Sequence, residues 1–362
     1  MDKITVLVVD DSAFMRKLIC DFLSEEEEFE VIGTARNGFD AIKKIEQFDP
    51  SVVTMDVEMP IMNGIEALKE IMQRFPRPVI MLSSTTKEGA ENTIHSLQLG
   101  AFDFITKPSG AISLDLYKVK DEIKKKVRAA KRANLGNNEQ IKKTIKKLST
   151  YSKIDVVREK RPIVQTGDTS KQKAFICIGT STGGPRALQQ VIPDFPSDLN
   201  APIFIVQHMP AGFTKSLATR LDTLSNIHVK EAEDGEIVKN GVAYIAPGGF
   251  HLKVVKVGMT LAIKLDQSPL RNGHRPSVDV MFESVSELSD YKKIAVVMTG
   301  MGSDGAKGLT ELKTAGNVKV IAESEETSVV FGMPKAAVRT NLVDTVENLE
   351  NITKTVLKFL QR

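Results

Sequence analysis

Short apolar runs alternate with amphipathic segments over two stretches of the chain, and this alternation constrains the fold more than any other feature. In residues 1–108 the apolar runs are ITVLVVD, VIGTA, SVVTMDV, PVIMLSS and FDFITKP. In residues 173–362 they are AFICIG, PIFIVQH, VAYIAP, IAVVMTG and VKVIAE, and LENITKTVLKFL predicts a closing helix. Strands that alternate with helices favour a parallel sheet with helices on both faces. We therefore predict two doubly wound α/β domains, one flavodoxin-like and one a Rossmann-like three-layer domain.

A lysine-rich segment separates the two stretches. Residues 118–147 contain twelve Lys and Arg but three Asp and Glu, so this segment carries a net charge of +9 and the rest of the chain −6. We assign residues 109–172 to a linker with helical character, which either lies in solvent or binds an acidic partner. Because the basic residues gather in the linker and not on a domain, the charge pattern argues against nucleic-acid binding.

Three features of the sequence favour the cytoplasm. No apolar run approaches the roughly 18 residues that a membrane-spanning helix needs. The first residues, MDKITVLVVDD, pass directly into a predicted strand, which is unlike a signal peptide. Cys20 and Cys177 both lie in apolar stretches, as buried and reduced thiols do. We expect a cytoplasmic protein that is not inserted in a membrane.

Charged residues stand at the ends of three predicted strands in the first domain. Asp10 and Asp11 follow the first strand, Asp56 ends the third, and Lys107 follows the fifth. The carboxyl ends of the strands in a doubly wound sheet meet at one edge, so these side chains can lie together. Three carboxylates there repel one another, which favours a hard divalent cation such as Mg²⁺ among them. A carboxylate beside such an ion can accept a phosphoryl group, whose charge Lys107 and the Ser83 hydroxyl can then bind.

Taken as a set, the motifs VVDDS, VTMDVEMPIMNG, MLSS and ITKP are far more specific than any single aspartate. They resemble the receiver domain of bacterial response regulators over nearly all of residues 1–108. The resemblance implies that a histidine kinase phosphorylates Asp56. It also implies that Asp10, Asp11 and Asp56 hold the Mg²⁺ that this phosphorylation requires.

The same resemblance identifies three residues of a conformational switch. Ser83 and Lys107 match the family's switch positions, and Ser83 keeps the hydroxyl that many receivers supply with threonine. Phe104 stands where some receivers have tyrosine. A phenolic hydrogen bond is therefore excluded from the switch of this chain.

The segment GTSTGG at residues 179–184 follows a predicted strand of the second domain and admits four interpretations. A phosphate-binding P-loop needs a lysine that GTSTGGPR lacks. A dinucleotide fingerprint occurs elsewhere, as GMGSDG at 300–305 with Glu323 ending the next strand, but Asp304 would repel a pyrophosphate and too little chain follows. A tight strand-to-helix turn needs only the glycines. The fourth interpretation is a nucleophile elbow, G-x-S-x-G, which would present Ser181.

A serine nucleophile needs a base and an orienting carboxylate. His208 follows PIFIVQ and Asp304 follows IAVVMTGMG, so both reach the sheet edge at which Ser181 stands. His274 lies in RNGHRPSVD, but three neighbours in one short loop rarely adopt triad geometry. The chain order Ser, His, Asp differs from the Ser, Asp, His order of α/β-hydrolases, which indicates a different fold with the same constellation.

Six motifs of residues 173–362 resemble the catalytic domain of the chemotaxis protein-glutamate methylesterases. They are GTSTGGPRAL, IVQHMP, YIAPGGFHL, HRPSVDVMF, VVMTGMGSDGAKGL and SVVFGMPKAA. The order of receiver and then esterase also agrees. The resemblance implies a triad of Ser181, His208 and Asp304 that hydrolyses glutamate γ-methyl esters on chemoreceptors and releases methanol, with no cofactor for this reaction. Many members of that family also deamidate receptor glutamines.

The residues suit this chemistry. Ser181 attacks the ester carbonyl, His208 transfers the proton, and Asp304 fixes the imidazole tautomer. The oxyanion needs backbone N–H donors, and the candidates are Thr182, Gly183 and Met301.

Two hypotheses from different classes remain. The first is an esterase that its receiver restrains and that phosphorylation of Asp56 releases. The second is a response regulator whose output domain only binds a partner. Binding alone does not require serine, histidine and aspartate at three strand ends, which favours the first hypothesis.

Overall fold

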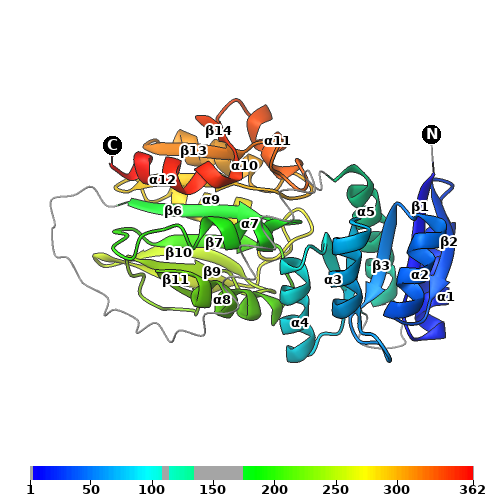
Figure 1. Cartoon of the computed structure of the whole chain (residues 1–362). Coiled ribbons are helices and arrows are strands. Elements are labelled where there is room, and N and C mark those ends of the chain that lie inside the picture. The colour runs from blue at the N-terminus through cyan, green and yellow to red at the C-terminus, as the bar shows by residue number, and fades with distance from the viewer. Residues whose placement is uncertain (1–2, 108–113, 134–173, 362) are drawn as a thin grey trace. The chain divides into compact units, whose positions relative to one another are not determined.

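The computed structural model describes residues 3–107, 114–133 and 174–361, and each part of the chain is considered by itself below. The chain forms two compact units, residues 1–155 and 156–362. Each unit contains a parallel sheet with helices packed against it (Figure 1). Most of the predicted linker, residues 109–172, lies outside the described residues.

The first unit contains a five-stranded sheet. Its strands are β1 (Ile4–Val9), β2 (Phe29–Ala35), β3 (Val52–Asp56), β4 (Val79–Ser83) and β5 (Asp103–Thr106). Their order is β2-β1-β3-β4-β5, and all neighbouring strands pair in parallel. This is the flavodoxin-like order, so the predicted fold is confirmed. The chain changes direction between β1 and β3, which brings Asp10 and Asp56 to adjacent strand ends.

The helices of the first unit form two groups. Helix α1 (Ala13–Ser24) contacts α5 (Leu114–Arg132). Helix α3 (Gly64–Arg74) contacts both α2 (Gly38–Phe48) and α4 (Lys87–Gln98). The two groups cover opposite faces of the sheet, as the doubly wound topology requires.

Helix α5 lies within the segment that the sequence analysis assigns to the linker. It contacts the sheet at β1, β3, β4 and β5. Its buried apolar residues recur at helical spacing and are Val119, Ile123, Val127 and Ala130. Lys124 forms ion pairs of 3.0 Å with both Glu25 and Glu26, which follow α1. This apolar face of α5 therefore packs on the first unit. The acidic residues after α1 neutralise part of the positive charge of the helix.

The second unit contains a seven-stranded sheet and a separate hairpin. The sheet strands are β6 (Ala174–Thr180), β7 (Ile203–Gln207), β8 (His228–Glu231), β9 (Val242–Ile245), β12 (Lys292–Val297), β13 (Val318–Glu323) and β14 (Thr345–Glu347). Their order is β14-β13-β12-β6-β7-β9-β8, with parallel pairing throughout. Strands β10 (His251–Val257) and β11 (Thr260–Asp266) form the antiparallel hairpin. The predicted doubly wound sheet is confirmed, whereas the sequence analysis did not predict the hairpin.

Helices follow most strands of the second unit. They are α7 (Gly184–Val191), α8 (Phe213–Leu224), α9 (Val278–Ser286), α10 (Ala306–Thr314), α11 (Met333–Arg339), the 3₁₀ turn η1 (Leu349–Asn351) and α12 (Ile352–Gln361). Helices α11 and α12 lie beside β13 at one side of the sheet (Figure 1). Phe204 lies at the centre of the core, edge-on to Phe175 and stacked on Tyr244. None of the helices in the described residues is both long enough and apolar enough to cross a bilayer.

The chain changes direction again at β6. Strand β7 lies on one side of β6 and β12 on the other, so the loops after β6 and β12 diverge at the carboxyl edge. Ligands of doubly wound sheets bind where such loops separate. Ser181 follows β6, and Met301 and Asp304 follow β12, so these residues flank that position.

Candidate active site and phosphorylation site

The charged residues at the strand ends of the first unit lie together at the carboxyl edge of its sheet. Asp10 and Asp56 are buried, and Lys107 Nζ lies 3.0 Å from Asp10 Oδ2 and 2.7 Å from Asp56 Oδ2. Burial raises the pKa of Asp56 to about 6, although the hydrogen bond from Lys107 opposes that rise. Together with the exposed Asp11, these carboxylates offer oxygen atoms within 4.8 Å of one another. Three hard oxygen donors at this spacing fit a divalent cation such as Mg²⁺.

Of the predicted switch residues, Lys107 contacts Asp56, whereas Ser83 and Phe104 contact residues of helices. The Ser83 hydroxyl accepts a hydrogen bond of 2.7 Å from Thr93 of α4. Phe104 is buried, and Lys126 Nζ of α5 lies 5.2 Å from the centre of its ring. The Ser83 hydroxyl itself donates to the Gly89 carbonyl at 3.0 Å, so a hydrogen bond from Ser83 to a phosphate on Asp56 requires its proton to leave that carbonyl. The switch roles stay predictions.

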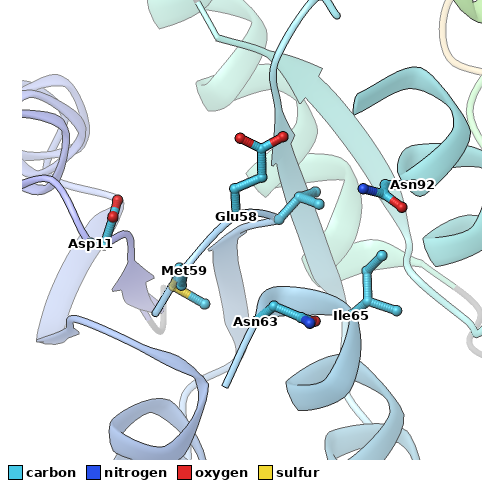
Figure 2. Close-up of a pocket in the computed structure, with 7 residues that line it drawn as sticks. Asp11, Glu58, Met59, Asn63, Ile65 and Asn92 are labelled. Carbon is cyan, nitrogen blue, oxygen red and sulfur yellow. The ribbon is translucent and has the colours of Figure 1, made fainter. Parts of the chain in front are cut away.

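A pocket opens beside Asp11 (Figure 2). It is lined by Asp11, Val57, Glu58, Met59, Asn63, Ile65 and Asn92. Asp11 and Asn92 lie on opposite sides of it in the close-up. Glu58 and Asn63 belong to the motif VTMDVEMPIMNG, but no role was predicted for them from the sequence. Asn92 of α4 lies in none of the motifs. The pocket therefore borders the acidic residues at Asp11.

The segment GTSTGG forms a sharp turn between β6 and α7, and Ser181 is its first residue after the strand. Gly183 has a φ of +80°, in the left-handed region that favours glycine. A Cβ at Gly184 would lie 2.1 Å from Gln207 Oε1, so a side chain does not fit there. The two glycines therefore serve the turn, as the plain-turn interpretation expects, and the same turn presents the serine.

His208 directly follows β7, the neighbour of β6, and its backbone N–H donates to the Thr180 carbonyl at 3.2 Å. Its side chain is 5% exposed, and Nε2 lies 2.8 Å from Asp304 Oδ2. Nδ1 is buried and has no hydrogen-bond partner within the described part of the chain. Nδ1 is therefore the nitrogen available for proton transfer. In the serine protease arrangement the aspartate binds Nδ1 and the serine faces Nε2, so the nitrogens exchange roles here.

Ser181 and His208 stand at adjacent strand ends. Gln207 Nε2 donates to the Ser181 carbonyl at 3.0 Å, which ties the end of β7 to the turn. Among residues 174–361, no hydrogen bond joins the Ser181 hydroxyl to His208. The hydrogen bond between nucleophile and base is often long or poorly aligned before substrate binds. Its absence here therefore does not argue against Ser181 and His208 as such a pair.

Asp304 is buried and is held by the loop before α9. Its Oδ1 accepts a hydrogen bond from Ser277 Oγ at 2.8 Å, and its Oδ2 accepts one from the Val278 N–H at 2.7 Å. Burial opposes its ionisation, but the hydrogen bonds from His208, Val278 and Ser277 hold the pKa of Asp304 well below its usual range. Asp304 is therefore an anion that fixes the proton of His208 on Nε2.

Other residues of the RNGHRPSVD loop surround this pair. Asn272 Nδ2 donates to Asp279 Oδ2 at 2.9 Å and to Asp304 Oδ1 at 3.3 Å, so it joins two buried carboxylates. The His274 ring stacks on the His208 ring with centroids 3.8 Å apart and an interplanar angle of 7°. From the sequence, this loop was weighed only as the source of a separate catalytic triad. In the structure it holds Asp304 and His208 instead.

The dinucleotide interpretation of GMGSDG does not agree with the structure. The Asp304 side chain of this loop contacts His208, and Glu323 is fully buried at the end of β13. Glu323 Oε2 accepts a hydrogen bond from the Thr299 N–H at 2.7 Å, so this carboxylate is not available to a ribose. Two other histidines also bond elsewhere, His228 to Asp222 and His251 to a backbone carbonyl.

Burial raises the pKa of Glu323 to about 7, against the opposing hydrogen bonds from Thr299 and Thr327. The carboxyl is thus protonated over a pH range in which the unfolded chain is ionised. Its stabilising contribution is complete below about pH 4.5 and is lost as the pH rises through about 7. A pKa shift of this size changes the free energy of unfolding by roughly 3 kcal/mol.

We expect Glu323→Gln to remove this pH dependence, because glutamine does not ionise. Between pH 4.5 and 8 the free energy of unfolding of the variant should gain roughly 3 kcal/mol relative to the wild type. Urea unfolding of the second unit at several pH values measures this difference. Glu325→Gln, a change at an exposed glutamate, serves as the control. A difference between wild type and Glu323→Gln that stays constant with pH contradicts the assignment.

Family models match both units. Residues 176–356 match the CheB methylesterase family, and residues 6–116 match the response regulator receiver domain. The chain is 53% identical over 359 residues to the protein-glutamate methylesterase/protein-glutamine glutaminase of Bacillus subtilis, with 99% of each chain covered. The enzyme of the same name from Halalkalibacterium halodurans is 55% identical over 360 residues, again with 99% of each chain covered. This chain belongs to the protein-glutamate methylesterase/protein-glutamine glutaminase family.

Solved structures of separate domains are also similar to this chain. The CheB methylesterase catalytic domain of Thermotoga maritima is 46% identical, with a TM-score of 0.49, and the match covers 52% of this chain and 98% of that one. The response regulator domain of the same organism's CheB is 51% identical, with a TM-score of 0.34, and the match covers 36% of this chain and 97% of that one. The family models and the full-length relatives confirm the resemblance stated from the motifs for both the receiver and the methylesterase domain.

Proposed function

We propose that this chain is a serine hydrolase that removes methyl groups from glutamate γ-methyl esters of chemoreceptors. The observation that carries the proposal is the buried His208, whose Nε2 is bonded to ionised Asp304 and whose Nδ1 is left for proton transfer beside the Ser181 turn. The family relationship supplies the substrate class. The reaction serves sensory adaptation in chemotaxis and takes place in the cytoplasm. A partner-binding output domain without catalysis does not account for this arrangement.

The reaction proceeds through an acyl-enzyme. Ser181 Oγ attacks the ester carbonyl while His208 Nδ1 takes the hydroxyl proton, and Asp304 stabilises the imidazolium. Collapse of the tetrahedral intermediate breaks the bond to methoxide, which leaves as methanol with the proton from His208. Water then attacks the acyl-enzyme with His208 as base, which yields glutamate and restores Ser181. With a receptor glutamine the leaving group is ammonia, so the same residues perform deamidation.

Backbone N–H groups stabilise the negative charge of the intermediate. The N–H of Ser181 donates to the Thr299 carbonyl at 3.0 Å, and that of Gly184 donates to the Ser181 carbonyl at 2.8 Å. Neither is available to the substrate. Neither group is among the oxyanion donors expected from the sequence, which are the N–H groups of Thr182, Gly183 and Met301.

The receiver makes the esterase responsive to a histidine kinase. Asp56 accepts the phosphoryl group, Asp10, Asp11 and Asp56 hold Mg²⁺, and Lys107 pairs with the added charge. A Mg²⁺ ion held by these carboxylates would neutralise charge on the transferred phosphoryl group. We further propose that the unphosphorylated receiver restrains the esterase and that phosphate on Asp56 releases it.

A fluorophosphonate probe tests the nucleophile and separates the esterase from a binding module. We expect the full chain to be labelled at Ser181, because His208 and Asp304 activate this hydroxyl. Peptide mass spectrometry after labelling identifies the modified residue. Chain unfolded in urea is the control, since its serines lack an activating base. Equal labelling of the folded and unfolded chains contradicts a serine hydrolase.

Replacement of Asp56 by asparagine should abolish activation by a small phosphodonor. In the wild type, acetyl phosphate with Mg²⁺ is expected to raise the rate of methanol release at least tenfold, which corresponds to about 1.4 kcal/mol, the size of one charge-assisted hydrogen bond. Asp56→Asn should keep the basal rate and show no response. Asp21→Asn, a change at an exposed carboxylate of α1, is the matched control and should respond as the wild type does. Activation of Asp56→Asn by acetyl phosphate argues against Asp56 as acceptor.

A further inference from the structure

Thr299, which lies just beyond β12, is hydrogen-bonded to the turn that contains Ser181. Its side chain is 1% exposed. The Thr299 carbonyl accepts hydrogen bonds from the Ser181 N–H at 3.0 Å and from Thr180 Oγ1 at 2.9 Å. The Thr299 hydroxyl donates to the Thr182 carbonyl at 2.9 Å. One residue thus contacts the proposed nucleophile and both of its neighbours in the chain.

The hydrogen bond to the Thr182 carbonyl also determines the direction of another group. The Thr182 carbonyl and the Gly183 N–H belong to the same planar peptide unit and point in opposite directions. A hydroxyl that fixes the carbonyl therefore fixes the N–H as well. Thr299 in this way aims the Gly183 N–H, one of the candidate oxyanion donors.

Gln207 acts in the same way on the preceding peptide unit. Its side chain is 2% exposed, and Nε2 donates to the Ser181 carbonyl at 3.0 Å. That carbonyl shares its peptide plane with the Thr182 N–H. Gln207 and Thr299 thus orient the two consecutive peptide units that follow the nucleophile, from opposite neighbouring strands, β7 and β12.

Thr299 is itself held in place by Glu323. Strand β13 pairs with β12 as far as Val297 and Ala322. Beyond this pair the Thr299 N–H donates to the Glu323 side chain at 2.7 Å. Thr327 donates to the other carboxyl oxygen of Glu323 at 3.1 Å, and the Val330 N–H donates to the Thr299 hydroxyl at 3.0 Å. All polar groups of Thr299 are therefore bonded, and the Thr182 carbonyl at 2.9 Å is a nearer acceptor for its hydroxyl than the Val330 carbonyl at 3.5 Å.

We propose that Thr299 and Gln207 are positioning residues of the esterase, which aim the Gly183 and Thr182 N–H groups at the oxyanion, and that Glu323 supports Thr299. This inference rests on the proposed role of Ser181 as nucleophile. An oxyanion exists in the transition state and not in the bound ester. The two residues therefore contribute to kcat and not to KM.

The test replaces each positioning side chain by one of similar shape without the hydrogen bond. Thr299→Val removes the hydroxyl, and Gln207→Met removes the amide. Each variant is expected to lower kcat for methanol release from methylated receptor at least tenfold, with KM within a factor of two of the wild type. Loss of a whole oxyanion donor lowers kcat about 10²–10³-fold, and a misdirected donor should lose part of that. All measurements use the full chain with acetyl phosphate and Mg²⁺.

Conservative variants separate positioning from simple structural support. Thr299→Ser keeps the hydroxyl and should restore kcat to within about threefold of the wild type. Glu323→Gln keeps an acceptor for the Thr299 N–H and should likewise retain kcat, whereas Glu323→Leu should lower it. Circular dichroism and thermal unfolding establish that each variant is folded. Should Thr299→Val not fold, Gln207→Met tests the same mechanism from the other strand.

The outcomes distinguish this inference from the proposed function. Folded Thr299→Val and Gln207→Met with the kcat of the wild type overturn the positioning role, provided that Ser181→Ala is inactive in the same assay. A raised KM at unchanged kcat also overturns it, because the side chains then act on substrate binding. Activity in Ser181→Ala overturns the proposed nucleophile and, with it, this inference.

Discussion

Ser181→Ala is expected to lower the rate of methanol release on the order of 10⁴-fold or more, to the level supported by substrate binding and the oxyanion donors alone. The side chain supplies the atom that attacks the ester, and the hydroxyl of the preceding residue is already bonded. Thr180 Oγ1 donates to the Thr299 carbonyl. Steady-state turnover of methylated receptor by the full chain measures the effect.

The control for this experiment is Ser286→Ala. Ser286 Oγ donates to the Glu283 carbonyl within α9, away from the triad, so its removal should leave turnover unchanged. Thermal unfolding should show both variants folded. Residual activity of more than a few per cent in folded Ser181→Ala argues that another group attacks the ester.

Asp304→Asn should lower kcat by about 10³–10⁴-fold. Both carboxylate oxygens of Asp304 accept backbone N–H groups, Oδ1 from Asp279 and Oδ2 from Val278. An asparagine amide in either orientation therefore directs its NH₂ at a donor. Where it replaces Oδ2, it donates to His208 Nε2 and moves the ring proton to Nδ1. The nitrogen that has to accept the serine proton is then already protonated.

A loss of kcat that does not depend on pH distinguishes the wrong His208 tautomer from the loss of the Asp304 charge alone. kcat of Asp304→Asn should stay low across the pH range in which the fold is stable. Asp290→Asn, a change at an exposed aspartate that pairs with Lys256, is the matched control and should behave as the wild type does. A loss of less than tenfold in folded Asp304→Asn contradicts the assigned role of Asp304.

That the residues of the proposed triad stand at one edge of the sheet could be predicted from the sequence, because parallel strands share one carboxyl edge. Ser181, His208 and Asp304 each follow an apolar run, and that rule alone brings them together without knowledge of side-chain conformation. The same rule brought together Asp10, Asp11, Asp56 and Lys107. In both units the short apolar runs were sufficient to identify the strands that carry these residues.

Details that depend on contacts between distant loops could not be predicted in this way. The RNGHRPSVD loop holds Asp304 through Ser277 and Val278, and no local pattern of spacing announces a loop that binds a carboxylate 27 residues further along the chain. Which imidazole nitrogen meets Asp304 depends on the rotamer of His208. The direction of the Ser83 hydroxyl depends on Thr93 of α4. Helix α5 was assigned to the linker because it is rich in lysine, and the glutamates that neutralise part of this charge lie about 100 residues earlier.

The two buried carboxylates of the active-site loops also have a consequence for amide hydrogen exchange. Asp279 Oδ1 accepts the N–H groups of Gly305 and Gly308, and Asp304 accepts those of Val278 and Asp279. Amides at helix starts usually exchange with solvent through small local openings, but these four can exchange only when the start of α9 separates from the start of α10. They should therefore be protected to a degree typical of the central strands. Conformational freedom for admitting a receptor helix then has to reside in other loops at this edge of the sheet.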